Sequence, residues 1–385
     1  MARPPVVASS KDLTRALRQG HPWVYRDALA AAPDLPAGTL VAVADRRGRE
    51  IAFGYWDMKG PIAVRVLDLA PIADAAALVR RRLEEALALR RARLDLRATN
   101  AFRWVHGEAD RLPGIHIDVY ASVVALRFDG EGSRAFYAHG NHLQSMLFAC
   151  GGELGLRKVV DREARGRHPE EVEVRENGVR FLVDVGRGQK GGLFLDQREN
   201  RQAVAQQAAG KSLLNLFGYT GGFSLHAALA GAARTDTVDI AGPAIAAARR
   251  NFALNRLDPS RAGFHVADVF AFLERAVAAG RTWDIVVSDP PSFAPSQRSL
   301  PSARKSYLRL HRLAALVAGR GGLLCAASCS SHLGRSDFLA LVEAGVREAG
   351  RRFALRSYTG AGVDHPTLPA FPEGDYLKFA VGEVR

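Results

Sequence analysis

The C-terminal half of the chain alternates short apolar runs with amphipathic stretches, and this alternation constrains the fold most strongly. From about Gly191 onward, a stretch with helical periodicity follows each of the runs LLNLF, TDTVDI, FHVAD, DIVVSDPP and GLLCAASCS. Repeated βα units of this length favour a parallel sheet with helices on both faces. Two further strand candidates, FALRSYT and YLKFAVGEV, close the chain. We therefore expect an α/β domain over residues 191–385.

Two other segments precede this domain, as a length of 385 residues would suggest. Over residues 1–70, short strand-like runs alternate with glycine turns, which is typical of a small β-barrel. A helix rich in Ala, Leu and Arg is predicted from about Pro71 to Leu96, and strand-like runs and a helix around Ser133–Cys150 follow it. We interpret residues 71–190 as a compact α+β domain without a visible catalytic constellation.

The net charge of +13 points to a polyanionic partner, because clustered Arg and Lys gain affinity by releasing phosphate counterions. A codon-biased, Arg-rich composition explains the same charge equally well. The stretch Arg18–Arg26 mixes basic and aromatic residues that suit phosphate contact and base stacking, although Trp23 and Tyr25 are equally plausible core residues.

Several classes of protein are disfavoured. No apolar run approaches the ~20 residues that span a bilayer, and the N-terminal residues lack the apolar core of a secretion signal. We expect a soluble, cytoplasmic protein that does not contact membranes. Three cysteines, Cys150, Cys325 and Cys329, cannot form a disulfide framework, and no Cys/His spacing indicates a metal site.

Three consecutive strands of the predicted sheet end in residues that suit a nucleoside. Open α/β sheets bind ligands at the carboxyl ends of their strands. Asp239 ends the second strand, where it can accept hydrogen bonds from ribose hydroxyls, and Asp268 ends the third, where it can address an adenine amino group. Either acid alone is more often a helix cap. The first strand leads into a glycine-rich loop that lacks the G-x-G-x-x-G pattern of dinucleotide sites and consists of Phe217, Gly218, Tyr219, Thr220, Gly221 and Gly222.

The fourth strand ends in a proline-rich loop, Ser288-Asp-Pro-Pro-Ser-Phe. Pro290 and Pro291 keep the backbone out of the helical region and so hold the preceding Asp289 in place. Phe293 then offers a face on which a base can stack. Loops of this type are typical of methyltransferases that act on planar nitrogen or carbon atoms, and we therefore predict a substrate site here.

The fifth strand ends at Cys329, beside the Asp289 loop in the expected sheet order, whereas Cys325 lies inside the strand as a predicted core thiol. Carbon-5 of a pyrimidine is too poor a nucleophile to take a methyl group directly. A thiolate that adds to carbon-6 makes carbon-5 enamine-like, and a base later removes the carbon-5 proton. Asp289 could hold a proton at N3, which requires a raised carboxyl pKa, and accept from the 4-amino group. Alternatively, Cys329 is only a small residue at the end of a strand, with no chemical role.

Several motifs in order resemble the large-subunit ribosomal RNA cytosine-C5 methyltransferase family over essentially the whole chain. They are GLFLDQRENR, LLNLFGYTGGFSLHAA, VVSDPPSF, SCSSHL and the tail Asp364–Glu373 with the following Tyr376-Leu-Lys. The resemblance implies an N-terminal PUA-type β-barrel for RNA, a middle α+β domain and a Rossmann-like class I methyltransferase domain. It also implies that S-adenosylmethionine is the cofactor, that large-subunit ribosomal RNA is the partner and that a cytosine is methylated.

The resemblance also assigns roles by motif. It implies that Cys329 is the nucleophile and that Asp289 lies at the transfer centre and against the cofactor. Pro290, Pro291 and Phe293 would meet the substrate. The glycine loop, Asp239 and Asp268 would bind the cofactor, and the segment around Gln197 and Arg198 would border its pocket. One departure is Ile240, because a serine is usual after the acid.

Two alternatives stay open at this level. Relatives with a very similar D-P-P-x-F loop methylate guanine N7 and lack the later cysteine, so Cys329 separates cytosine from guanine chemistry. An RNA methyltransferase that acts on a guanine or adenine nitrogen is therefore the second hypothesis. A non-catalytic RNA-binding or ribosome-assembly factor is the third, against which the intact glycine loop and both acids argue. A homodimer also stays open.

Overall fold

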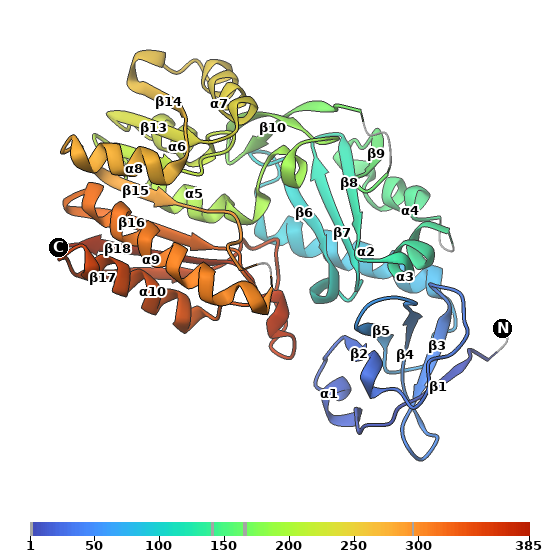
Figure 1. The fold of residues 1–385 in the computed structure, drawn as a ribbon. Coiled ribbons are helices and arrows are strands. Elements are labelled where there is room, and N and C mark those ends of the chain that lie inside the picture. Colours follow the sequence, from blue (N-terminus) through green and yellow to red (C-terminus); the bar gives the residue numbers. More distant parts are fainter. Residues whose placement is uncertain (1–2, 140–141, 165–167, 295) are drawn as a thin grey trace. The chain divides into compact units, whose positions relative to one another are not determined.

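A computed structural model describes residues 3–139, 142–164, 168–294 and 296–385 (Figure 1). The chain forms two compact units. The first unit contains residues 1–175, 184–191 and 363–374, and the second contains residues 176–183, 192–362 and 375–385. The domain boundaries expected after residues 70 and 190 stay predictions.

The N-terminal part of the first unit is a five-stranded sheet in the order β1-β3-β4-β5-β2, with the short helix α1 (Thr14–Arg18). β1 runs parallel to β3, and the other strand pairs are antiparallel. Alternate strand residues such as Val41, Val43 and Ala52 point into one apolar core, as a small barrel requires. The strands are β1 (Val6–Ala8), β2 (Trp23–Tyr25), β3 (Leu40–Ala44), β4 (Glu50–Trp56) and β5 (Ile62–Asp68).

The rest of the first unit packs helix α2 (Ala75–Arg93) on a four-stranded sheet in the order β6-β7-β8-β9. The Asp74 carboxylate caps α2 by accepting from the Ala77 amide. The helix expected around Ser133–Cys150 is interrupted: the structure has α3 (Glu131–Arg134), a π-turn and α4 (Leu143–Cys150). The strands are β6 (Ala101–His106), β7 (Ile115–Tyr120), β8 (Val123–Phe128) and β9 (Lys158–Asp161).

A β-hairpin made of β10 (Glu171–Glu176) and β11 (Val179–Asp184) follows. Its turn residues, Asn177 and Gly178, both have positive φ, at 50° and 83°. An Asn-Gly pair favours this backbone because Asn tolerates the left-handed region and Gly adopts it freely.

The second unit contains a seven-stranded sheet in the order β14-β13-β12-β15-β16-β18-β17. The first five strands in that order are parallel, as the βα alternation predicts. The chain order reverses between β12 and β15, and such a switch point is where open sheets bind ligands. The strands are β12 (Ser212–Leu216), β13 (Arg234–Asp239), β14 (Ala262–Val266), β15 (Trp283–Ser288), β16 (Ala318–Ser328), β17 (Phe353–Thr359) and β18 (Lys378–Val384).

Helices cover both faces of this sheet, as expected (Figure 1). Neighbouring residues of one strand enter opposite cores: Leu324 packs with α8, α9 and α10, whereas Cys325 packs with α5 and α6. Cys325 is therefore a core thiol, as predicted. The helices are α5 (Arg198–Ala205), α6 (Gly222–Leu229), α7 (Gly242–Leu254), α8 (Val269–Ala278), α9 (Leu300–Val317) and α10 (Arg335–Glu348).

The expectation of a parallel sheet fails at its last strand. β18 is inserted between β16 and β17 and runs antiparallel to both. A connection through residues 360–377 brings the chain back beside β16, so the closing strand enters the sheet next to its edge strand β17 and runs in the reverse direction. This arrangement places Lys378 opposite Ser328, beside the predicted nucleophile. No described helix is both long and apolar enough to cross a membrane.

Candidate active site

The glycine-rich loop after β12 is held against the acid that ends β13. Phe217, Tyr219 and Gly221 adopt positive φ angles of 55°, 47° and 82°. The Asp239 carboxylate accepts from the Tyr219 amide at 2.9 Å and from the Ala241 amide at 2.8 Å. The structure thus brings together the predicted loop and the predicted ribose-binding acid.

Asp268 has a structural role in the same region, because its carboxylate caps α8 by accepting from the Ala271 amide at 2.9 Å. The cap interpretation is thus correct for this acid, and its predicted adenine contact is an additional role that stays a prediction. Ile240 is 71% exposed and Val266 is 60% exposed. Since Asp239 and Val266 are register partners, these apolar side chains lie at one sheet edge. Apolar faces beside carboxylates fit a nucleoside, whose base is apolar on its faces and whose edges donate hydrogen bonds.

The segment that precedes α5 reaches the end of β15. Gln197 is buried and its amide donates to the Asp289 carboxylate at 3.0 Å. Asn200 in turn donates to the Gln197 side-chain oxygen at 2.7 Å, and Thr359 donates to Asn200 at 2.8 Å. Arg198 is also buried, and its guanidinium donates to the Glu199 carboxylate at 3.2 Å. Neither Asn200 nor Thr359 was predicted as a site residue from the sequence, and both are linked to Asp289 only through this chain of contacts.

Hydroxyl groups join the two loops that carry Asp289 and Cys329. The Ser292 and Ser330 hydroxyls are 2.9 Å apart. The buried Tyr307 hydroxyl lies 2.8 Å from the Ser328 hydroxyl and 3.3 Å from that of Ser330. The adjacent strands β15 and β16 are therefore linked beyond their backbone ladder, at the end of the sheet where the sequence predicts the reaction centre.

Cys329 follows β16 directly and is half-buried. Burial raises the pKa of the Tyr307 hydroxyl, and Cys329 and Asp289 raise it further, so both groups lie within electrostatic reach of this tyrosine. The other strand cysteine differs: burial raises the pKa of Cys325 to about 12, which makes it unreactive near neutral pH.

The predicted substrate residues lie in the Asp289 loop itself. Pro290 is buried and Pro291 is exposed. The Phe293 ring packs against Tyr307, with centroids 4.9 Å apart, and against Phe217 at 6.4 Å. Phe293 therefore has a packing role, and its service as a stacking face stays a prediction.

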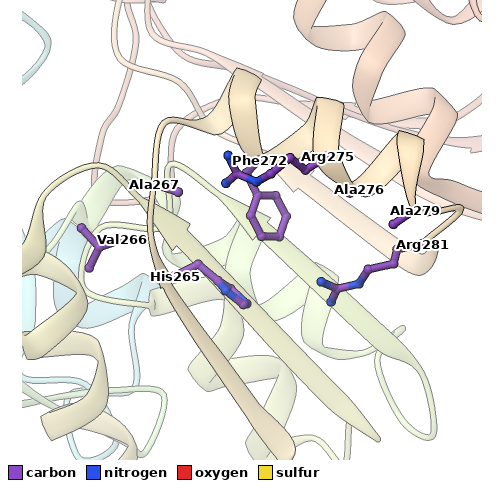
Figure 2. Close-up of a pocket in the computed structure, with 8 residues that line it drawn as sticks. All are labelled: His265, Val266, Ala267, Phe272, Arg275, Ala276, Ala279 and Arg281. Atoms are coloured by element: carbon purple, nitrogen blue, oxygen red, sulfur yellow. The ribbon is translucent and has the colours of Figure 1, made fainter.

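A groove of about 500 Å³, which Val266 also lines, lies between β14 and α8 (Figure 2). His265 from β14, Phe272 from α8 and Arg281 from the loop after α8 point toward it (Figure 2). None of the site residues predicted from the sequence lines this groove. We therefore do not assign it as the reaction centre. Its lining residues are His265, Val266, Ala267, Phe272, Arg275, Ala276, Ala279 and Arg281.

The fold and the site together define a class I methyltransferase that uses S-adenosylmethionine and carries an N-terminal PUA-like domain. Residues 162–367 match the model of the S-adenosylmethionine-dependent methyltransferase family, and residues 10–69 match a PUA-like domain. The chain belongs to this methyltransferase family and, within it, to the family of ribosomal RNA large subunit methyltransferase I.

Two relatives illustrate this membership. The ribosomal RNA large subunit methyltransferase I of Shewanella denitrificans is 34% identical, over 96% of this chain and 97% of the relative. The ribosomal RNA large subunit methyltransferase of Deinococcus radiodurans is also 34% identical, over 96% of this chain and 95% of the relative.

Solved structures agree on the fold. A Streptococcus mutans protein described as a candidate S-adenosylmethionine-dependent methyltransferase superposes with a TM-score of 0.85 at 22% identity, covering 98% of this chain and 100% of that one. A candidate methyltransferase solved in complex with S-adenosylhomocysteine has the same TM-score and identity and covers 99% of this chain and 100% of its own.

Proposed function

We propose that this methyltransferase forms 5-methylcytidine in large-subunit ribosomal RNA, with Cys329 as the nucleophile. The observation that carries the proposal is the convergence of Cys329 and Asp289 at the ends of neighbouring strands, whose loops are tied by the Ser292–Ser330 contact of 2.9 Å. The names of the relatives support ribosomal RNA as the substrate, and the PUA-like domain and the net charge of +13 suit it.

The residues after β12, β13 and β14 would hold the cofactor. The glycine loop would approach it through backbone amides, Asp239 would accept from the ribose, and Asp268 would address the adenine edge. Gln197 and Arg198 precede the same loop in the family pattern and would border the pocket. When bound, S-adenosylmethionine supplies an electrophilic methyl group on a sulfonium.

The chemistry of a pyrimidine explains why a cysteine is needed. The Cys329 thiolate forms a bond to carbon-6 of the base, which pushes electron density to carbon-5. Carbon-5 would then take the methyl group from bound S-adenosylmethionine, whose sulfur would keep the electron pair of the broken S–C bond. A base removes the carbon-5 proton, and the bond between Cys329 and carbon-6 breaks to restore the aromatic ring and the thiolate.

The hydrogen bond from Gln197 supports one of the two roles considered for Asp289. A neutral amide that donates to a carboxylate stabilises its ionised form. The ionised carboxylate suits acceptance from the cytosine 4-amino group, and it does not suit donation of a proton to N3. We therefore assign Asp289 as a cytosine-selecting acceptor held by Gln197, with Pro290, Pro291 and Phe293 positioning the base.

Nucleoside mass spectrometry of ribosomal RNA incubated with the protein and S-adenosylmethionine tests this proposal. We expect 5-methylcytidine as the product, with naked RNA and large-subunit particles tried in parallel. Methylguanosine or methyladenosine would overturn the assignment in favour of nitrogen chemistry. A protein without affinity for S-adenosylmethionine in calorimetry would point instead to an RNA-binding or ribosome-assembly factor. We also propose a cytoplasmic location, where such an enzyme would meet ribosomal RNA. Sedimentation would show whether the protein forms a homodimer.

A further inference from the structure

A buried lysine lies directly beside the proposed nucleophile. Lys378 is the first residue of β18, and its register partner on β16 is Ser328, the residue before Cys329. Its side chain is 1% exposed. Its ammonium donates to the Ser330 carbonyl at 2.7 Å and to the Tyr376 carbonyl at 2.9 Å. One side chain thus starts opposite the residue before Cys329 and ends on the residue after it.

The charge of this lysine is unusual in its setting. Among the residues that the structure describes, no carboxylate lies within ion-pair distance of the Lys378 ammonium, although burying an unpaired ammonium is unfavourable. Burial lowers the pKa of Lys378, whereas Asp375 and Cys329 act in the opposite direction, and Arg335 adds to the lowering. The Lys378 ammonium is therefore stabilised by the carbonyls of Ser330 and Tyr376 and by two groups that can carry a negative charge, Asp375 and Cys329.

We propose that Lys378 is a positioning residue for Cys329: its ammonium fixes the nucleophile loop through the Ser330 carbonyl and stabilises the Cys329 thiolate. This inference rests on the proposed function, because it gives Cys329 the role of nucleophile. A nearby cation raises the thiolate fraction of a cysteine, and only the thiolate attacks carbon-6. Lys378 touches neither the base nor the cofactor in this scheme and acts through Cys329.

The groups around Cys329 make a specific electrostatic balance. Cys329, Asp375 and Arg335 all act on the pKa of Lys378, and Cys329 and Asp289 both act on the pKa of Tyr307. A carboxylate near a cysteine disfavours its thiolate, whereas a cation favours it. Tyr307 stays protonated near neutral pH, because its pKa is raised. Lys378 is the buried cation of this set, so its charge is the least screened by solvent.

The test measures the thiol rather than the methylation rate. In a Cys150→Ser background, the alkylation of Cys329 by iodoacetamide is followed by intact mass spectrometry from pH 5 to 10; Cys325 is buried and silent. We expect the wild-type Cys329 to titrate below the usual pKa of about 8.5. We expect Lys378→Met to raise that apparent pKa by about one unit, which slows alkylation roughly tenfold at a fixed pH below it. Lys378→Arg should recover part of the shift, and the exposed Lys305→Met should leave the profile unchanged.

Two results would overturn the proposal. One is an unchanged pH profile in a folded Lys378→Met variant, even if methyl transfer is slower, because a merely structural lysine would give that outcome. The other needs no variant: a wild-type Cys329 that titrates at or above the ordinary value. Neither outcome depends on which base is methylated. If ribosomal RNA gains methylguanosine while Lys378 still shifts the thiol, the proposed function fails and the Lys378–Cys329 coupling stands.

Discussion

The Ser292 and Ser330 hydroxyls lie 2.9 Å apart and join the Asp289 loop to the Cys329 loop. Ser330 also lies 3.3 Å from the Tyr307 hydroxyl and offers its carbonyl to Lys378. One serine thus connects a tyrosine from α9, a lysine from β18 and the loop after β15. The spacing between the proposed nucleophile and the base-selecting acid therefore depends on groups outside both loops.

Tyr307→Phe should make the distance between the Asp289 loop and the Cys329 loop less well fixed. The variant loses the contacts with the Ser328 and Ser330 hydroxyls, at a cost of about 1 kcal/mol in the free energy of unfolding. We expect kcat to fall roughly tenfold with little change in affinity for S-adenosylmethionine, because a small displacement of reacting groups lowers the rate strongly. The matched control is Tyr55→Phe, which removes a buried hydroxyl bonded to the Pro113 carbonyl in the first unit. Similar losses of kcat in both variants would exclude a specific role for Tyr307.

Cys329→Ala should reduce the rate of methyl transfer to below about a thousandth of the wild-type rate, since the carbon-6 adduct cannot form. Calorimetry should show nearly unchanged affinity for S-adenosylmethionine, because the glycine loop and Asp239 are untouched. Cys150→Ala is the control and should keep full activity. Substantial transfer by Cys329→Ala would remove this residue from the mechanism.

Gly221→Ala should impair cofactor binding. Gly221 has a φ of +82°, and an added Cβ would lie 3.0 Å from the Ala248 Cβ. Forcing alanine into this left-handed backbone costs about 1–2 kcal/mol, and relaxation of the loop should weaken S-adenosylmethionine binding about tenfold. Gly210→Ala is the matched control, because Gly210 has a φ of +70° with nothing within 4 Å of its Cβ. An equal loss of affinity in both variants would indicate a general effect on stability.

The free energy of unfolding should depend on pH in part because of the buried His311. Neither ring nitrogen has a hydrogen-bond partner among the described residues, and burial lowers its pKa to about 3. The unfolded chain binds a proton near pH 6.5, so the stability that neutral His311 contributes is complete above that pH and is lost as the pH falls toward 3. This loss amounts to about 2 kcal/mol between pH 7 and 5. His106 and His116 in the first unit have lowered pKa values and act in the same direction.

Urea unfolding of His311→Leu at pH 7 and pH 5 measures this contribution. The difference in the free energy of unfolding between the two pH values should be smaller than in the wild type. The exposed His332→Leu should leave the difference as it is. An unchanged difference in His311→Leu would mean that His311 does not titrate on unfolding.

The parts of the site that follow local sequence patterns were predictable, and those that depend on distant pairing were not. The glycine loop, Asp239 and the neighbouring positions of Asp289 and Cys329 follow from βα alternation, because parallel strands end at one sheet edge. The antiparallel β18 has no such local signature, so the position of Lys378 beside Ser328 appears only in the structure.

Side-chain partners explain the remaining differences. Gln197 was expected beside the cofactor from its motif alone, and the structure shows that its amide donates to Asp289. Asp268 shows the converse, since the structure gives it the role of a helix cap, while its predicted ligand contact stays a prediction. Periodicity places a residue at an edge of the sheet, but hydrogen-bond geometry decides which atom it meets.

The covalent adduct between Cys329 and its base is the most direct test of the account. Large-subunit ribosomal RNA in which 5-fluorocytidine replaces cytidine is incubated with the protein and S-adenosylmethionine. Fluorine at carbon-5 cannot be removed as a proton, so the adduct should persist after methyl transfer. We predict that mass spectrometry of the digested complex finds the nucleotide on the peptide containing Cys329. Methylated RNA without any trapped protein, or a nucleotide attached elsewhere, would contradict the proposed mechanism.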